Sequence, residues 1–176
     1  MYNLTNTCVI MKARFYGLFL VLLSAVVLTS CEKDDDIRLS DVPVAVMSTF
    51  DLKFPNAGYT EWEKKKGYYV ADFWQEGMDT HAWIDSKGEW KMTELDFGAN
   101  VQLLPEFVRN AFQSSKYGTW RVDDIDKYER YDCTFYLIEI ETKGEKDRDL
   151  YYDESGVLLK DEVDKENNDV TPDTKL

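Results

Sequence analysis

Two stretches of the chain carry apolar residues at the spacing of an amphipathic helix. The first follows Pro43 and presents Val46, Met47 and Phe50 on one side, and the second surrounds Pro105 with apolar residues at positions 104, 107, 108, 111 and 112. Proline suits the first turn of a helix, because the N–H that it lacks has no helical partner there. We therefore expect two helices, each with one apolar face that packs against another layer.

Short runs of aromatic and β-branched residues follow each of these helices. Such runs, bounded by turn residues, are typical of β-strands. In the first half a strand is expected after Trp62, and the others are expected at residues 67–75, 80–85 and 89–95. In the second half the runs lie at residues 116–130, 133–143, 148–153 and 157–160. The chain is thus expected to fold as a helix and four strands, twice.

Two connections between the predicted strands share the pattern Asp-x-x-Gly, from Asp85 to Gly88 and from Asp153 to Gly156. This pattern favours hairpin turns in which the Asp side chain bonds the backbone and glycine takes a positive φ. Because the same features recur in the same order, the chain indicates an internal repeat. We predict an α+β fold of two tandem units, residues 41–98 and 99–160, each a helix packed on a four-stranded antiparallel sheet. The polar residues 161–176 are expected to be disordered.

The first 30 residues have the pattern of a secretory signal peptide. Lys12 and Arg14 precede an uncharged apolar run at residues 15–28, which is shorter than the ~20 residues that span a bilayer. Met11 is a second candidate for the true start, because residues 1–10 lack signal character. This pattern indicates export from the cytoplasm.

The apolar run ends in Leu28-Thr29-Ser30-Cys31, which resembles a bacterial lipobox. In a lipobox the cysteine becomes the first mature residue and is acylated, so Cys31 is the predicted lipidation site and the link to the membrane. The next residues belong to an acidic tether, residues 31–40. Within it, Lys33, Asp34 and Asp35 resemble the export signal of surface lipoproteins in some Gram-negative lineages. We expect an outer-membrane lipoprotein exposed at the cell surface, with a periplasm-facing anchor as the alternative.

Acidic side chains outnumber basic ones, 34 to 21, which gives a net charge of −13. Removal of the signal peptide takes away Lys12 and Arg14 and lowers the net charge to −15. Nucleic acid is not an expected partner, because phosphate binding needs a basic face. A protein partner is expected to present a basic patch instead.

The residues of the predicted domain are similar to those of a known family. The helix after Pro43, Trp62 and the segments 54–57, 68–73 and 83–90 resemble the PepSY-like family of bacterial lipoproteins, which is similar in fold to β-lactamase inhibitor protein. The resemblance covers residues 42–160. It implies tandem α+β units and a role in binding or inhibition, and it brings no catalytic residues. Inhibition of β-lactamase is not carried over, because that activity depends on particular contact loops that have no match here.

The residue types that carry catalysis are sparse in the chain. His81 is the single histidine, and its strand pattern near Asp79 and Asp85 favours a packing or surface role over that of a general base. Cys133 is expected to be a buried, inert thiol. Paired carboxylates are too abundant in so acidic a chain to mark an active site. We therefore predict no enzyme activity, no catalytic residue, no metal site and no cofactor.

Aromatic residues supply a candidate binding face. If Tyr69 and Phe73 pack under the helix, then Tyr68 and Trp74 point to the opposite side of their strand. Together with two further tryptophans they form the candidate face, which comprises Tyr68, Trp74, Trp83 and Trp90. Tyr and Trp carry much of the energy of protein interfaces, although the face could equally be covered by the other unit or by a dimer mate.

These features lead to one functional hypothesis and one alternative. The first is an envelope-anchored lipoprotein that acts as a non-catalytic protein-binding or inhibitor-like module, with an envelope enzyme or protease as partner. The alternative is a surface lipoprotein that captures glycans or peptides for nutrient uptake, since tryptophan side chains also stack on sugars.

Overall fold

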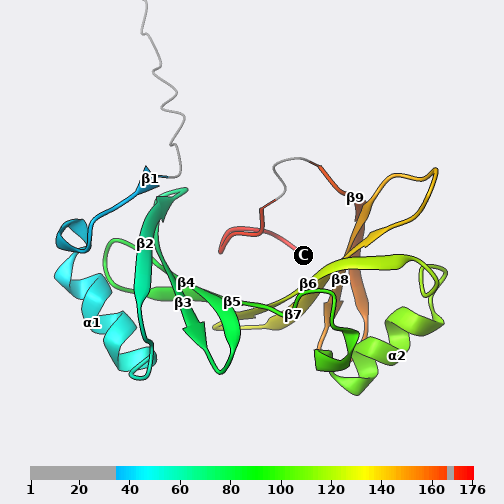
Figure 1. Cartoon of the computed structure of the whole chain (residues 1–176), viewed down its shortest axis with the longest axis horizontal. Helices are drawn as coiled ribbons and strands as arrows, with labels where there is room; N and C mark the ends of the chain where they lie inside the picture. Colours follow the sequence, from blue (N-terminus) through cyan, green and yellow to red (C-terminus); the bar gives the residue numbers. More distant parts are fainter. Residues whose placement is uncertain (1–34, 166–168) are drawn as a thin grey trace, which may run out of the picture. The chain divides into compact units, whose positions relative to one another are not determined.

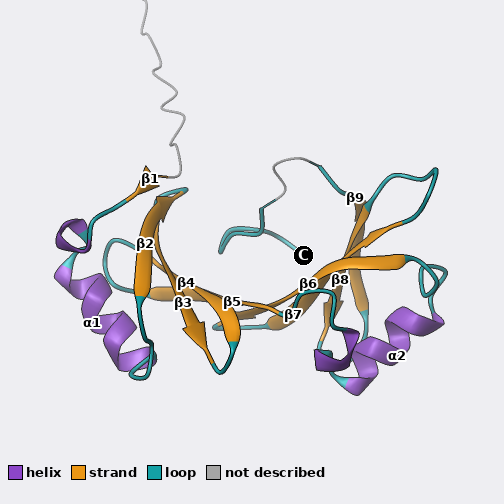
Figure 2. Ribbon diagram, in the orientation of Figure 1, coloured by secondary structure: helices purple, strands orange, loops and turns teal. Residues whose placement is uncertain are grey.

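The computed structural model describes residues 35–165 and 169–176, which belong to one compact unit spanning Glu32–Leu176. Within these described residues, two α-helices and nine strands follow one another, and Figure 2 shows their arrangement. The strands are β1 (Asp35–Asp36), β2 (Thr60–Lys65), β3 (Tyr68–Gln75), β4 (Met78–Ile84), β5 (Trp90–Asp96), β6 (Arg121–Arg130), β7 (Thr134–Glu141), β8 (Arg148–Asp153) and β9 (Leu158–Val163). The helices are α1 (Val44–Lys53) and α2 (Glu106–Ser114), and short 3-10 turns lie at Leu39–Asp41 and Val101–Leu103. Among the described residues, no helix is both long and apolar enough to cross a bilayer.

All nine strands form one antiparallel sheet, in the order in which they occur in the sequence. The prediction of two tandem units, each with its own four-stranded sheet, is therefore wrong. Strands β5 and β6 join the two halves through five registered pairs, from Met92 opposite Arg130 to Asp96 opposite Asp126. Pairing these strands satisfies the N–H and C=O groups that two separate sheets would leave along their open edges. The order of a helix and four strands, twice, is nevertheless present along the chain.

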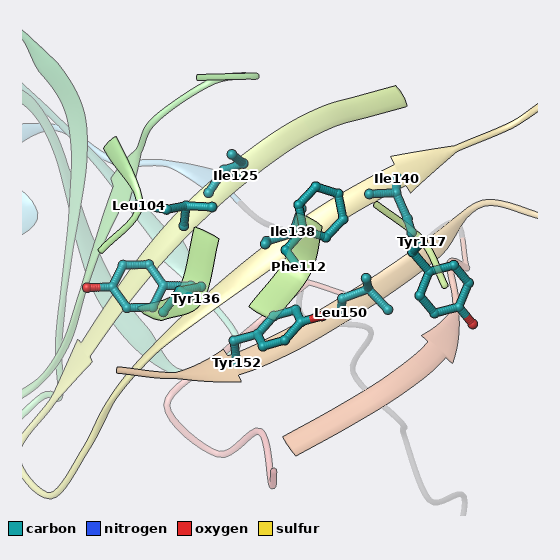
Figure 3. Close-up of a cluster of buried hydrophobic side chains, with 10 residues drawn as sticks. Leu104, Phe112, Tyr117, Ile125, Tyr136, Ile138, Ile140, Leu150 and Tyr152 are labelled. Carbon is teal, nitrogen blue, oxygen red and sulfur yellow. The ribbon is translucent and has the colours of Figure 1, made fainter. Parts of the chain in front are cut away.

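Both helices pack on the same face of this sheet, which we call the helix face (Figure 1). Val46 and Phe50 of α1 lie against Phe73, as the apolar spacing predicts. The second helix packs over β6 to β8 (Figure 3), in a cluster that contains Leu104, Val108, Phe112, Tyr117, Ile125, Tyr136, Ile138, Ile140, Leu150 and Tyr152. Each helix begins directly after its proline, Pro43 or Pro105.

The two Asp-x-x-Gly turns form as predicted, and each touches a helix. The Asp85 carboxylate accepts hydrogen bonds from the N–H groups of residues 87 and 89, at 2.9 Å each, and Asp153 accepts the equivalent bonds. Both glycines have φ near +85°. A Cβ atom on Gly88 would lie 2.7 Å from a carbonyl oxygen of α1, and one on Gly156 would lie 2.6 Å from a carbonyl oxygen of α2. Glycine is therefore required twice over at each turn, by its backbone angle and by the approach of the helix.

The other face of the sheet, which we call the tail face, carries a third apolar cluster. Its members are Val70, Trp83, Met92, Tyr128, Phe135, Leu137, Tyr151 and Val170. Val170 comes from residues 169–176, which we call the C-terminal segment. This segment lies on the tail face, on the opposite side of the sheet from the two helices (Figure 1). The structure thus differs from the expected disorder after residue 160, since residues 161–163 belong to β9 and the C-terminal segment contacts the sheet.

Candidate functional site

Four neighbouring strands place polar side chains in one registered row on the tail face. Asp72 of β3 lies opposite His81 of β4, His81 lies opposite Glu94 of β5, and Glu94 lies opposite Tyr128 of β6. Directly opposed side chains on one sheet face lie close enough to interact. The row is therefore a continuous polar strip beside the apolar cluster.

His81 lies between two carboxylates in this row. Its Nδ1 atom is 3.7 Å from Glu94 Oε2, and its Nε2 atom is 3.8 Å from Asp72 Oδ2. Burial lowers the pKa of the imidazole, but the hydrogen bond and charge of Glu94 and the charges of Asp72 and Asp79 outweigh it and raise the pKa to about 9. At neutral pH the imidazole carries its proton and faces carboxylates, an arrangement that suits a structural ion pair and does not suit a general base.

Glu94 and Asp126 share a buried tyrosine hydroxyl. Tyr128 Oη lies 3.3 Å from Glu94 Oε1 and 3.4 Å from Asp126 Oδ2, and Trp83 Nε1 donates to Glu94 Oε2 at 3.4 Å. Burial, followed by the nearby charges of Glu94 and Asp124, raises the pKa of Asp126 to about 8. The Asp126 carboxyl, only 8% exposed, therefore keeps a proton near neutral pH.

A second row on the tail face consists of acidic side chains alone. Glu139 of β7 lies opposite Asp124 of β6 on one side and Asp149 of β8 on the other, and Asp149 lies opposite Glu162 of β9. Burial and the charges of Asp149 and Asp124 raise the pKa of Glu139 to about 7. Like charges placed opposite each other cost stability, and Lys160 Nζ, which lies 2.6 Å from Glu162 Oε1, offsets part of that cost at one end of the row.

Glu139 and Asp149 of this row line a cavity of about 330 Å³ between the sheet and the C-terminal segment. Its wall includes aromatic and aliphatic side chains as well as two lysines, but acidic groups predominate. The lining residues are Lys65, Trp83, Glu94, Asp126, Tyr128, Leu137, Glu139, Asp149, Asp164, Lys165, Asp169 and Val170. The site is an acidic, partly apolar depression on the sheet.

The four predicted face residues do not share one surface. Tyr68 and Trp83 are neighbours on the tail face, with ring centroids 6.0 Å apart, but Trp83 is only 2% exposed. Trp74 is 65% exposed and follows Val70 at an even spacing along β3, on the tail face. Trp90 packs instead with the α1 cluster, where its ring lies 3.8 Å from Lys53 Nζ.

The structure describes only one of the predicted lipidation and export residues. Cys31, Lys33 and Asp34 lie outside the described residues, and Asp35 begins β1. Cys133 is exposed, so the prediction of a buried thiol is wrong; it follows the turn between β6 and β7, where its carbonyl oxygen accepts from Arg130 N at 2.8 Å.

Two groups of possible cation ligands occur in the described part of the chain. Asp72, Asp79 and His81 form one, and Asp96, Asp124 and Asp126 form the other, with ligand atoms within 4.8 Å of one another in each. A metal ion would have to displace the proton of His81 in the first group and that of Asp126 in the second. Both groups lie on the tail face.

Sequence reasoning missed the acidic cavity, although the chain holds a signal for it. Asp124, Asp126 and Tyr128 alternate along β6, and Leu137 and Glu139 alternate along β7. Alternation identifies residues that share a face of one strand. Which carboxylates lie opposite each other depends on the register of β6 to β9, and the β5–β6 pairing, which the prediction of two sheets left out, brings Glu94 to the same cavity.

Comparison with known proteins finds a matching family and several solved structures with a similar fold. The model of a family described as "Putative beta-lactamase-inhibitor-like, PepSY-like" matches residues 67–160. A BLIP-like protein from Bacteroides fragilis NCTC 9343 is 32% identical, with a TM-score of 0.66, over 72% of this chain and 89% of that one. A DUF2874 family protein from Bacteroides ovatus ATCC 8483 is 31% identical, with a TM-score of 0.66, over 69% of this chain and 86% of that one.

A more distant structure shares the fold. It comes from Bacteroides eggerthii DSM 20697, is described as "putative periplasmic proteins", and is 24% identical with a TM-score of 0.65 over 69% of this chain and 88% of that one. None of the curated proteins compared with the chain matches it.

Proposed function

Since this chain belongs to the PepSY-like family, we propose that it is an envelope-anchored lipoprotein whose sheet binds another protein without catalysing a reaction. The tail face carries the binding site in this proposal. The observation that supports it most directly is the acidic cavity, because Glu139 and Asp149 line it opposite each other and a ligand of positive charge would offset their repulsion.

The chemistry of the cavity favours a basic side chain of a protein partner. A lysine or arginine that enters it would meet Glu139 and Asp126, whose pKa values are raised by burial first and then by neighbouring carboxylates. A nearby cation stabilises the ionised forms of both groups. Binding is therefore expected to release protons near neutral pH, and the cavity gains charge complementarity when it is filled.

The anchor is part of the same proposal. Cys31 would be acylated after removal of residues 1–30, and Lys33, Asp34 and Asp35 would direct the protein to the outer face of the outer membrane. Mass spectrometry of the native protein should find an acylated Cys31 at the N-terminus, and protease treatment of whole cells should remove the domain. An intact, unmodified N-terminus would contradict the anchor, and full protection from protease would favour attachment that faces the periplasm.

Binding is tested with the acyl-free chain, residues 32–176, immobilised and exposed to envelope extract. A protein captured in this way is purified, and its affinity is measured by calorimetry for the wild type and for the double variant Glu139→Gln, Asp164→Asn. The matched control, Asp51→Asn with Glu106→Gln, removes the same charge from exposed positions on the two helices.

We expect the tail-face variant to bind about ten-fold or more weakly and the helix variant to bind as the wild type does. Equal loss in both variants would show that net charge alone matters. The absence of any saturable partner would overturn the proposal.

One observation favours the alternative function, capture of a glycan. Trp74 presents 65% of its surface to solvent on the tail face, and an exposed indole can stack on a sugar ring. A glycan array probed with the wild type and with Trp74→Ala separates the two functions. Binding that is lost in Trp74→Ala and unaffected by Glu139→Gln would support glycan capture.

A further inference from the structure

We propose that the tail face is a peptide-binding surface and that the C-terminal segment, residues 169–176, is its resident intramolecular ligand. The inference rests on the proposed protein-binding function, and it adds the form of the partner: a turn-forming segment led by a small β-branched apolar residue. A partner segment of this chemistry has to displace the chain's own.

The contacts of the C-terminal segment are those of a docked peptide. Val170 is 4% exposed and packs into the apolar cluster beside Trp83 and Tyr151. Tyr68 Oη donates to Asp173 Oδ2 at 3.0 Å, and the ammonium groups of Lys65 and Lys66 lie 3.6 Å from Asp169 Oδ2. The segment belongs to no strand of the sheet, so side chains of the sheet hold it in place of a β-ladder.

Arg130 holds the backbone of the segment. Its Nη2 donates to the carbonyl oxygen of Thr171 at 2.6 Å, and its Nη1 donates to that of Thr174 at 2.7 Å. The guanidinium also lies 5.0 Å from the centroid of the Phe135 ring. Because Phe135 belongs to the sheet, this stacking orients the two donors whether or not the segment is bound.

Hydrogen bonds within the segment fold it into a turn. Thr174 N donates to the carbonyl oxygen of Thr171 at 3.0 Å, and Thr171 N donates to Thr174 Oγ1 at 2.9 Å. Pro172 occupies the second position of this turn, where its fixed φ is favoured. A preformed turn loses little freedom on docking, so a short peptide of this sequence is expected to bind by itself.

The C-terminal segment makes few contacts for its length, so a partner segment can displace it. It buries one apolar side chain and makes a few hydrogen bonds, against the cost of ordering eight residues at the chain end. It also borders the acidic cavity through Asp169 and Val170. A partner segment in its place would carry neighbouring residues over the carboxylates, where basic side chains are favoured.

The test uses a fluorescent peptide of residues 169–176 and the chain of residues 32–176, with binding followed by anisotropy. In Val170→Asp the chain's own segment is expected to leave the face, so the peptide should bind this variant about ten-fold or more tightly than the wild type. Leu176→Asp is the matched control, because it adds the same charge to the same segment at an exposed position, and it should behave as the wild type does.

Two further measurements keep the inference open to refutation. A peptide with Val170→Asp should bind neither chain, and Arg130→Lys added to the Val170→Asp chain should weaken binding of the wild-type peptide about ten-fold. If the Val170→Asp chain loses its fold, Pro172→Gly with Thr174→Ala in the full segment serves as the releasing variant. No peptide binding to a folded releasing variant, or equal binding to the wild type and the releasing variant, would overturn the inference.

The peptide assay needs no partner, so its result is separate from that of the capture experiment. Peptide binding without any captured partner would leave the resident ligand established and the proposed function refuted. A captured partner without peptide binding would support the proposed function and refute the resident ligand.

Discussion

At the residue scale, the two turn glycines and the tryptophans show how context decides the meaning of a residue type. Gly88 and Gly156 sit in turns that sequence chemistry predicts, and each also lies against a helix carbonyl that only the fold reveals. Trp74 and Trp83 lie on neighbouring strands and differ from 65% to 2% exposed. The same amino acid is thus a surface group in one place and part of the core in the other.

Gly88→Ala is expected to destabilise the protein more than Gly67→Ala. Both glycines have φ near +85°, a conformation that costs a non-glycine residue about 1–3 kcal/mol. Only at Gly88 does the new Cβ meet a helix carbonyl, since Gly67 has no neighbouring atom within 4 Å. Urea denaturation measures both variants, and an equal loss of unfolding free energy would contradict the helix contact.

Trp83→Ala is expected to lower the unfolding free energy by about 3–5 kcal/mol, whereas Trp74→Ala should change it by no more than about 0.5 kcal/mol. The reason is the burial of Trp83 in the tail-face cluster and the exposure of Trp74. Thermal denaturation of both variants checks the difference. Similar losses for the two would mean that Trp74 is covered in solution, for example by a second copy of the chain.

At the scale of elements, alternation along one strand predicts which side chains share a face, as for Tyr68 and Trp74 opposite Phe73, but it does not predict neighbours on different strands. Alternation along the strand predicts Tyr69 and Phe73 on the helix face, and both pack in the α1 cluster. On the tail face the acidic row depends on the register of β6 to β9. Strand alternation in a single sequence does not determine which carboxylates lie opposite each other, so the cavity could not be predicted.

Asp126→Asn is expected to stabilise the protein increasingly as the pH rises from 5 to 8. Burial raises the pKa of Asp126 in the folded state to about 8, whereas an unfolded aspartate titrates near ~3.9. Between these values the unfolded state has lost its proton and the folded state has kept it, so stability falls as the pH rises. The variant lacks this loss, and its advantage should grow by more than about 1 kcal/mol over that range.

The measurement is urea denaturation at pH 5, 6.5 and 8. Asp51→Asn makes the same substitution at an exposed position on α1 and controls for the change of side chain itself. An advantage of Asp126→Asn that stays constant with pH would contradict a protonated carboxyl at this site.

At the scale of the whole molecule, one continuous sheet replaces the expected pair of sheets. The order of the helices and strands could be predicted from the sequence, because the hydrophobic period and the turn residues are local properties. The β5–β6 pairing could not be predicted in this way, because it joins two strands that are separated in the sequence by an entire helix. The consequence is a single structural unit whose two helix-covered clusters depend on the same ladder.

Phe73→Ala is therefore expected to weaken the whole domain. Phe73 is 1% exposed under α1, and its truncation should cost about 3–5 kcal/mol. Hydrogen exchange should accelerate at the amide of Ile138 on β7 as well as at that of Ala82 on β4, because the sheet opens as one unit. Leu52→Ala, at an exposed position of α1, should leave both unchanged, and acceleration confined to β2–β5 would indicate two independent units.

Strand β1 leaves only a very short segment between the proposed membrane anchor and the sheet. Asp35 and Asp36 pair with Lys64 and Glu63 at the edge of the sheet, only four residues beyond Cys31. Four residues extend over at most about 14 Å, so an acylated Cys31 would hold that edge close to the lipid head groups. A partner would then have to reach a domain that lies near the bilayer, and lengthening the stretch between Cys31 and Asp35 should ease capture of large partners more than of small ones.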